Sequence, residues 1–320
     1  MYTYFKSKQW AMWAYFGGLC IILLLISQTY CSVLLNDWYR QFYDILQNVE
    51  KNTLTDFWDS LTKFMLIAMP YVFIIAVTNF LSRLYMLRWR QALAEDMSQR
   101  WLRTNIHIEG GSQRIQEDTA RFAQILGSLG IEIIRGIMVL IAFIPILWGL
   151  SVKLTVPIFG SIPGSLVWFA LIISIGGILI SWFVGIKLPG LERKNRITEA
   201  AYRKELVLGE DNRKSITNES LFELFTGLRL NHQKLYLHQS YFDLWASSYS
   251  QIVTILPFLI GGHGLFSGVL TLGMLVQISN CFSKVQDSFS IILYRWQNIT
   301  ELRAMHTRLT EFYKLMEEKC

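Results

Sequence analysis

Three glutamates, Glu192, Glu199 and Glu210, follow one another at helical spacing. They are seven and eleven residues apart, and at about 100° per residue both steps return to within about 20° of one helix face. If one helix carries all three, the stripe is about 27 Å long. A carboxylate that is partly shielded from water has a raised pKa and can bind and release protons. The spacing is therefore compatible with a proton-binding surface. The alternative is a solvated helix face on which Glu199 pairs with Arg203 four residues later.

Three further acids have basic residues close to them in the sequence. Glu117 can pair with Arg121 four residues later, and Asp118 can reach the same arginine. Glu132 lies at the start of an apolar run with Arg135 one turn away, so an ion pair at the membrane edge competes with a proton site there. Structural pairing and proton binding both stay open for these acids.

The composition indicates a membrane protein that is not an enzyme. Hydrophobic residues make up 52% of the 320 residues and charged residues only 17%, whereas soluble domains carry about 25% charged residues. The net charge of +6 is typical of Lys and Arg on the cytoplasmic side of a membrane, so we expect no nucleic-acid partner. The four cysteines and five histidines show no metal or redox spacing, and no nucleophile–histidine grouping stands out. We expect no catalytic residue, no cofactor and no metal site.

Six apolar stretches are long enough to cross the roughly 30 Å hydrocarbon core of a bilayer. They are predicted near residues 10–30, 64–84, 130–150, 165–186, 247–266 and 270–292. The first has no small-residue cleavage site after it, so it is expected to be an anchor and not a removed signal peptide. Three spans contain a proline, at 70, 145 and 257, which bundled membrane helices tolerate as a bend.

Basic residues concentrate in the two long stretches 87–128 and 187–246. By the positive-inside rule, these stretches and both termini are cytoplasmic. Both stretches mix charges with spaced apolar residues, which predicts helical excursions beyond the bilayer. The fold class is therefore all-α, a single transmembrane transporter domain over residues 1–320 that has the outline of the membrane half of an ABC exporter. No G-x-x-x-x-G-K-[ST] phosphate loop occurs in the sequence, so this chain is not expected to hydrolyse ATP itself.

Three segments resemble the SbmA/BacA family of peptide transporters: NDWYRQFYDILQ (36–47), HIEGGSQRIQEDTARFA (107–123) and IKLPGLERKNRITEAAYRKELVLGED (186–211). The resemblance covers nearly the whole chain. It implies a short member without the N-terminal extension of the family, forming a homodimer in the bacterial inner membrane with an ABC-exporter-like fold and no nucleotide-binding domain. It also implies import of antimicrobial peptides, peptide antibiotics and similar bulky solutes, driven by the proton gradient.

The resemblance also bears on individual residues. It strengthens the proton-coupling assignment of Glu199 and Glu210, adds Glu109 and Glu117 as candidates, and supports Glu192 less. One family glutamate aligns with Gly127 here, and the nearest acid, Glu132, is five residues on and on another helix face. Substrate-binding residues are not indicated.

Two other functions stay open. The chain can be the membrane subunit of an ABC transporter whose ATPase is encoded separately and docks near Glu199–Arg203. It can also be an inactive short homologue that transports nothing.

Overall fold

A computed structural model describes residues 3–104, 110–152, 164–211, 213 and 216–317. The regular elements among these residues are all helical. The chain divides into two compact units, Met1–Leu171 with Pro257–Cys320 as unit 1 and Ile172–Leu256 as unit 2.

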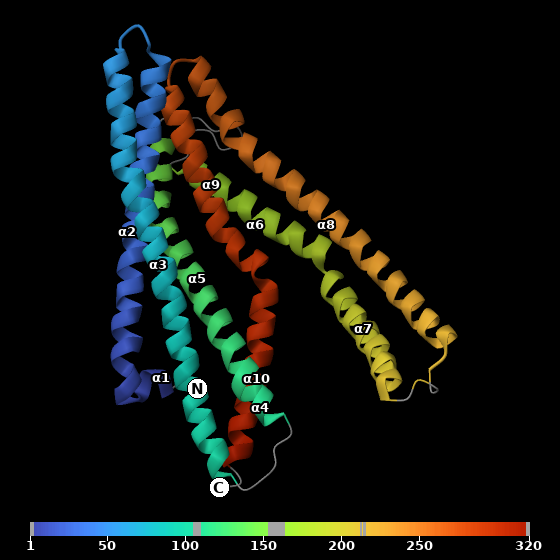
Figure 1. Cartoon of the computed structure of the whole chain (residues 1–320). Helices are drawn as coiled ribbons and strands as arrows, with labels where there is room; N and C mark the ends of the chain where they lie inside the picture. The colour runs from blue at the N-terminus through green and yellow to red at the C-terminus, as the bar shows by residue number, and fades with distance from the viewer. Residues whose placement is uncertain (1–2, 105–109, 153–163, 212, 214–215, 318–320) are drawn as a thin grey trace. The chain divides into compact units, whose positions relative to one another are not determined.

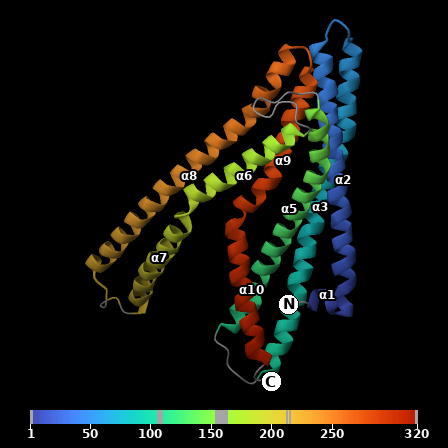
Figure 2. The ribbon, with the colours of Figure 1, turned by 180° about the vertical axis from the view of Figure 1, so that it is seen from behind.

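Unit 1 opens with a long helical hairpin (Figure 1, Figure 2). The short α1 (Thr3–Lys6) precedes α2 (Lys8–Gln47), and α3 (Leu54–Arg103) returns alongside α2. Thr53 starts α3 with a capping box, because its hydroxyl accepts from the Asp56 backbone N–H and the Asp56 carboxylate accepts from the Thr53 backbone N–H. With 50 residues, α3 is about 75 Å long and so extends well beyond the hydrocarbon core. The predicted helical extension after the second span is confirmed.

Polar and aromatic contacts hold the hairpin together. The Trp38 indole donates to the backbone oxygen of Ser60 at 2.8 Å, and the Gln28 amide donates to the Thr78 hydroxyl at 2.5 Å. Trp38 is buried and stacks on Phe42, so it packs inside the hairpin. The Tyr85 hydroxyl closes the other end by donating to the backbone oxygen of Ala14.

The rest of unit 1 packs against this hairpin. Gly110, in a left-handed conformation, leads into α4 (Gly111–Gln113), the π-helical η1 (Arg114–Asp118) and α5 (Thr119–Ser151). After α8 (Asn218–Phe266), Gly268 forms the turn into α9 (Leu272–Tyr294), which packs on both α2 and α5, and α10 (Trp296–Glu317) follows.

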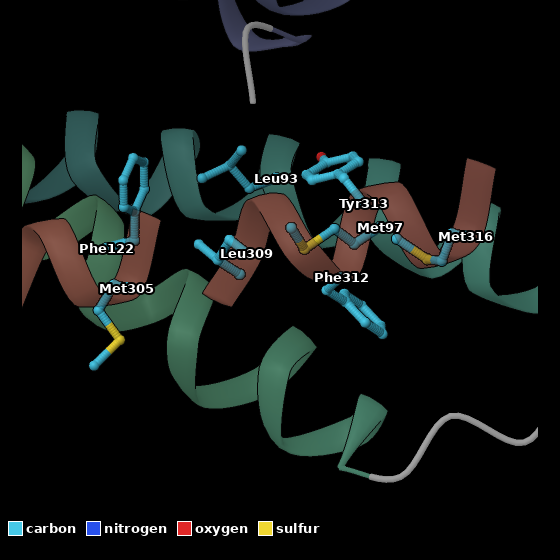
Figure 3. Packing of buried hydrophobic residues seen from close by; sticks show 8 residues of the cluster. All are labelled: Leu93, Met97, Phe122, Met305, Leu309, Phe312, Tyr313 and Met316. Atoms are coloured by element: carbon cyan, nitrogen blue, oxygen red, sulfur yellow. The ribbon is translucent and has the colours of Figure 1, made fainter. Parts of the chain in front are cut away.

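A hydrophobic core lies where α3, α5 and α10 meet (Figure 3). Leu93 and Met97 come from α3, Phe122 comes from α5, and α10 supplies the remaining side chains Met305, Leu309, Phe312, Tyr313 and Met316. The Tyr313 hydroxyl also donates to the Asp96 carboxylate at 2.6 Å. Near the other chain end, Tyr4 of α1 stacks on Trp89 of α3. Both ends of the described chain are therefore fixed to the second half of α3.

Unit 2 is a second helical hairpin. It consists of the larger part of α6 (Ser165–Gly185), α7 (Leu188–Asp211) and most of α8 (Asn218–Phe266). A turn at residues 186–187 separates α6 from α7. The Trp245 indole donates to the Ser181 hydroxyl at 2.8 Å, and the Tyr249 hydroxyl donates to the backbone oxygen of Ile173, so α8 is fixed to α6. The residues of α7 and the first part of α8 are helical, as predicted for these parts of the stretch 187–246.

Five helical segments in the described residues are long and apolar enough to cross a membrane: Lys8–Gln47, Leu54–Arg103, Gly111–Ser151, Ser165–Glu210 and Asn218–Phe266. They contain the first five predicted spans, so the chain is a multi-pass membrane protein. The sixth predicted span, 270–292, coincides with α9, which is helical but too polar to be counted with them.

Candidate functional site

The three glutamates of the predicted stripe lie on one helix. Glu192, Glu199 and Glu210 all belong to α7, so the helical spacing read from the sequence applies to them. The helix does not continue through from the membrane span, because α6 ends at Gly185 and α7 begins at Leu188. The stripe is therefore carried by a helix of its own.

The Glu199 carboxylate contacts a histidine of the next helix. The Glu199 carboxylate lies 3.1 Å from Nε2 of His232 on α8, and the Asn195 side-chain amide lies 3.4 Å from the same nitrogen. The contact comes from another helix, whereas the alternative partner in the sequence, Arg203, lies on the same helix as Glu199. The His232 side chain is only 27% exposed, whereas that of Glu199 is 53% exposed. A carboxylate in contact with an imidazole can exchange a proton with it, since imidazole changes charge near neutral pH.

Aromatic packing surrounds His232. Its ring stacks on Tyr236 of the same helix, and its Nδ1 is buried without a hydrogen-bond partner among the described residues. A ring with the proton on Nε2 donates from this nitrogen to the Glu199 carboxylate.

The other two acids of the stripe are less constrained. Glu192 pairs with Arg196 at 3.6 Å, but the Arg196 side chain is 75% exposed, and such exposed pairs contribute little. Glu210 is exposed near the end of α7. Of the three acids, Glu199 is the one that contacts a side chain of another helix, His232 of α8.

The acids of unit 1 take part in ion pairs between helices. Glu117 pairs with Arg121 at 3.0 Å, as expected, and Arg121 also reaches Glu301 of α10 at 3.2 Å. Asp118 is buried and pairs with Arg308 instead of Arg121. Glu109 lies outside the described residues. A surface hollow of about 430 Å³ adjoins Glu117 and is also lined by Arg90, Ser112, Gln113, Gln116 and Ala120.

Glu132 has the tightest ion pair of the candidates. Arg295, at the junction of α9 and α10, donates from Nε at 2.7 Å and from a terminal nitrogen at 2.6 Å to the two carboxylate oxygens. The partner of Glu132 in this bidentate ion pair is thus Arg295, and not Arg135 as expected from the sequence. Because it joins α5 to the α9–α10 junction, Glu132 fixes the relative position of these helices.

Gly127 lies in a contact between helices. It is buried on α5, and a Cβ atom at this position would meet the side chain of Met86 on α3. The fold therefore has no room for a glutamate here without a shift of Met86. Glu132 points to a different partner and does not occupy the same place.

His232 and Arg295 are the functional candidates that the sequence reasoning missed. They lie 33 and 163 residues from their partners in the chain. Local spacing therefore gives no signal for either. Lys284 and Asp287 of α9 were also missed, although two charges inside a predicted span are a signal that the sequence does contain.

Comparisons with known proteins agree with this architecture. The chain matches the SbmA/BacA-like family over residues 7–317. The inner membrane ABC transporter ATP-binding protein YddA of Escherichia coli (strain K12) is 27% identical over 93% of this chain and 57% of its own length. An uncharacterized ABC transporter ATP-binding protein of Synechocystis is 24% identical over 96% of this chain and 47% of its own length.

A plant relative is similar to the same degree. The ABC transporter D family member 2, chloroplastic, of Arabidopsis thaliana is 24% identical over 93% of this chain and 42% of its own length. The chain thus spans about half the length of these curated relatives. Since the family match covers nearly all of its residues, the chain belongs to the SbmA/BacA-like family.

Proposed function

We propose that this chain is a proton-driven importer of peptides, which include antimicrobial peptides, peptide antibiotics and similar bulky solutes. The observation that carries the proposal is the family match over residues 7–317. The long apolar helices and their extensions support it, because a transporter of this kind needs several spans around a solute path. In this proposal the chain works as a homodimer with an ABC-exporter-like membrane architecture.

The proposed orientation places both termini and the helical extensions in the cytoplasm. The basic residues of the two long stretches support this orientation by the positive-inside rule. The contacts of α1 and α10 with the second half of α3 support it too, since they hold both chain ends beside one extension. A bacterial inner membrane is the location that this family membership favours.

Proton coupling is assigned to the acids of the extensions, with Glu199 first. The contact of Glu199 with His232 links α7 to α8. A change in the charge of Glu199 therefore changes the strength of the interaction between these two helices. A proton can shift the balance between outward-open and inward-open states only by the difference in proton affinity between them, about 1.4 kcal/mol for each pKa unit. Several acids are needed for a large shift, and Glu210, Glu192, Glu117, Glu109 and Glu132 are the further candidates.

Purified protein in proteoliposomes tests this function. A labelled proline-rich cationic peptide should accumulate when an inward proton gradient is imposed, and the uptake should stop when an ionophore collapses the gradient. Equal uptake with and without the gradient would reject proton drive. Liposomes without protein measure the peptide that merely adheres to lipid.

A second function is the membrane subunit of an ABC transporter with a separate ATPase. The printed names of two relatives favour it, because these proteins are described as ABC transporter ATP-binding proteins. If this alternative is correct, uptake depends on ATP inside the vesicles. An ATPase that binds the α7 segment Glu199–Arg203 should then co-purify with the chain. Uptake driven by a pH gradient alone would exclude it.

A further inference from the structure

The α9 helix runs alongside the membrane-crossing parts of its neighbours. At its start, the backbone N–H groups of Leu272 and Gly273 donate to Gln47 and Asp44 near the end of α2. At its end, Arg295 binds Glu132 at the beginning of the apolar part of α5. Between these points α9 lies antiparallel to both helices. It therefore occupies the same layer as their apolar stretches, although its own sequence is much more polar.

Two charged side chains lie deep in this layer. At about 1.5 Å per residue, Asp287 lies about 12 Å and Lys284 about 16 Å from the level of Arg295. Ile291 and Ser288 lie against Gly136, inside the predicted span 130–150, so the charged pair is level with the apolar residues that follow Gly136 on α5. Glu132 and Arg295 lie at the edge of the predicted span 130–150, so we place them at the edge of the hydrocarbon core. These depths then lie near the middle of a core that is about 30 Å thick.

The two charges share the face of α9 that unit 1 leaves uncovered. The opposite face is filled by Ile278, Phe282 and Val285, which are fully buried against the neighbouring helices. Lys284 and Asp287 are exposed, and at about 100° per residue they lie within about 60° of each other, with Asn280 between their directions. Among the described residues neither charged group has a hydrogen bond or an ion pair.

A charged side chain at this depth is costly if it faces lipid. Such residues instead face water-filled cavities or bind one another or a solute, and they mark solute pathways. The chemistry of this face is mixed. The Asp287 carboxylate suits an ammonium or guanidinium group, the Lys284 ammonium suits a carboxylate or carbonyl oxygen, and the Asn280 amide can bond to either side of a peptide group.

We propose that Asn280, Lys284 and Asp287 line the aqueous path of the transporter and that Asp287 holds a cationic group of the peptide in transit. This inference rests on the proposed function and adds a substrate subsite to it. Charge complementarity selects the occupant, because a bare carboxylate level with the bilayer interior attracts a cation more strongly than it would in bulk water.

The first experiment measures access of water to this face. Lys284→Cys and Asp287→Cys variants in membrane vesicles are treated with a charged thiol reagent that reacts only in water, and peptide mapping by mass spectrometry separates the new cysteine from the native ones. Both positions should be modified. Two controls at the same depth should stay unmodified: Val285→Cys on the buried face, and Ile141→Cys on α5, whose side chain is 70% exposed beside apolar neighbours. Lack of modification at 284 and 287 would overturn the proposal.

The second experiment measures binding. An excess of a proline-rich cationic peptide should slow the modification of Lys284→Cys, and Asp287→Asn should lower initial peptide uptake at low concentration about tenfold or more, while Asp287→Glu retains it. Unchanged uptake by Asp287→Asn, with native protein that transports the peptide, would overturn the subsite. If the native protein takes up no peptide under any gradient, the proposed function fails instead, and the modification pattern alone then decides whether α9 lines an aqueous path.

Discussion

The ion pair between Glu132 and Arg295 should stabilise the α9–α10 junction measurably. Glu132→Gln keeps the shape of the side chain but removes its charge, and Arg295→Gln removes the other partner. The geometry is that of a strong pair, with two parallel hydrogen bonds of 2.6 and 2.7 Å. We expect each variant to loosen the junction between α9 and α10 without unfolding the helices themselves.

The expected size follows from the partial burial of the pair. Exposed ion pairs contribute about 0.2–1 kcal/mol, whereas breaking a buried pair costs about 3–5 kcal/mol. The side chains here are 45% exposed for Arg295 and 28% exposed for Glu132, so the pair lies between these cases. We therefore expect a coupling free energy of about 1–2 kcal/mol, with solvent screening already taken into account.

Hydrogen–deuterium exchange of the backbone amides at residues 291–299 is the suitable assay. It reports local opening, which a global melting curve of a two-unit membrane protein does not isolate. A loss of about 1–2 kcal/mol corresponds to exchange that is about 5- to 30-fold faster. The double variant Glu132→Gln with Arg295→Gln should show little more than either single variant. Additive effects, with a coupling below about 0.3 kcal/mol, would refute the reasoning.

Arg196→Gln provides the matched control. It removes an arginine that also pairs with a glutamate, but at 3.6 Å and with the arginine side chain 75% exposed. Exchange in α7 should change by less than about threefold, as expected for an exposed pair on one helix.

Three further substitutions test the packing that positions the candidate residues. Gly127→Ala should destabilise the contact of α5 with α3 by about 1–3 kcal/mol, because the new methyl group meets Met86. A thermal-unfolding midpoint close to that of the native protein would contradict this prediction. Gly273→Ala should lower the stability at least as much, because its Cβ would meet the backbone oxygen of Arg40, which cannot move as a side chain can. We expect faster proteolysis in the α8–α9 turn, and unchanged proteolysis would argue against this close approach. Tyr313→Phe removes the hydrogen bond to Asp96 and should lower the stability of the α3–α10 core by about 1–2 kcal/mol in denaturant titrations, whereas no change would show that the bond is not formed in solution.

The sequence predicted the helices well because long apolar stretches and charged helical extensions have strong local signatures. The extension of α3 beyond the second span and the placement of three acids on α7 both followed from periodicity. The break between α6 and α7 falls just before Pro189, where the missing backbone N–H and the fixed backbone angle favour the start of a new helix.

The partners of the acids could not be predicted in the same way. Reasoning from spacing proposes residues three or four positions away, such as Arg203 for Glu199 and Arg135 for Glu132. In the structure, His232 and Arg295 reach these acids from other helices, because helix packing brings distant parts of the chain within hydrogen-bonding distance.

Peptide uptake by a variant with both Glu199→Gln and Glu210→Gln tests the central claim most directly. The assay uses proteoliposomes with an imposed inward proton gradient and equal amounts of inserted protein, and Glu223→Gln, an exposed acid on α8, is the control. Uptake by the double variant should fall to the level without a gradient while the control transports normally. Gradient-driven uptake by the double variant equal to that of the native protein would show that these two glutamates do not couple uptake to protons.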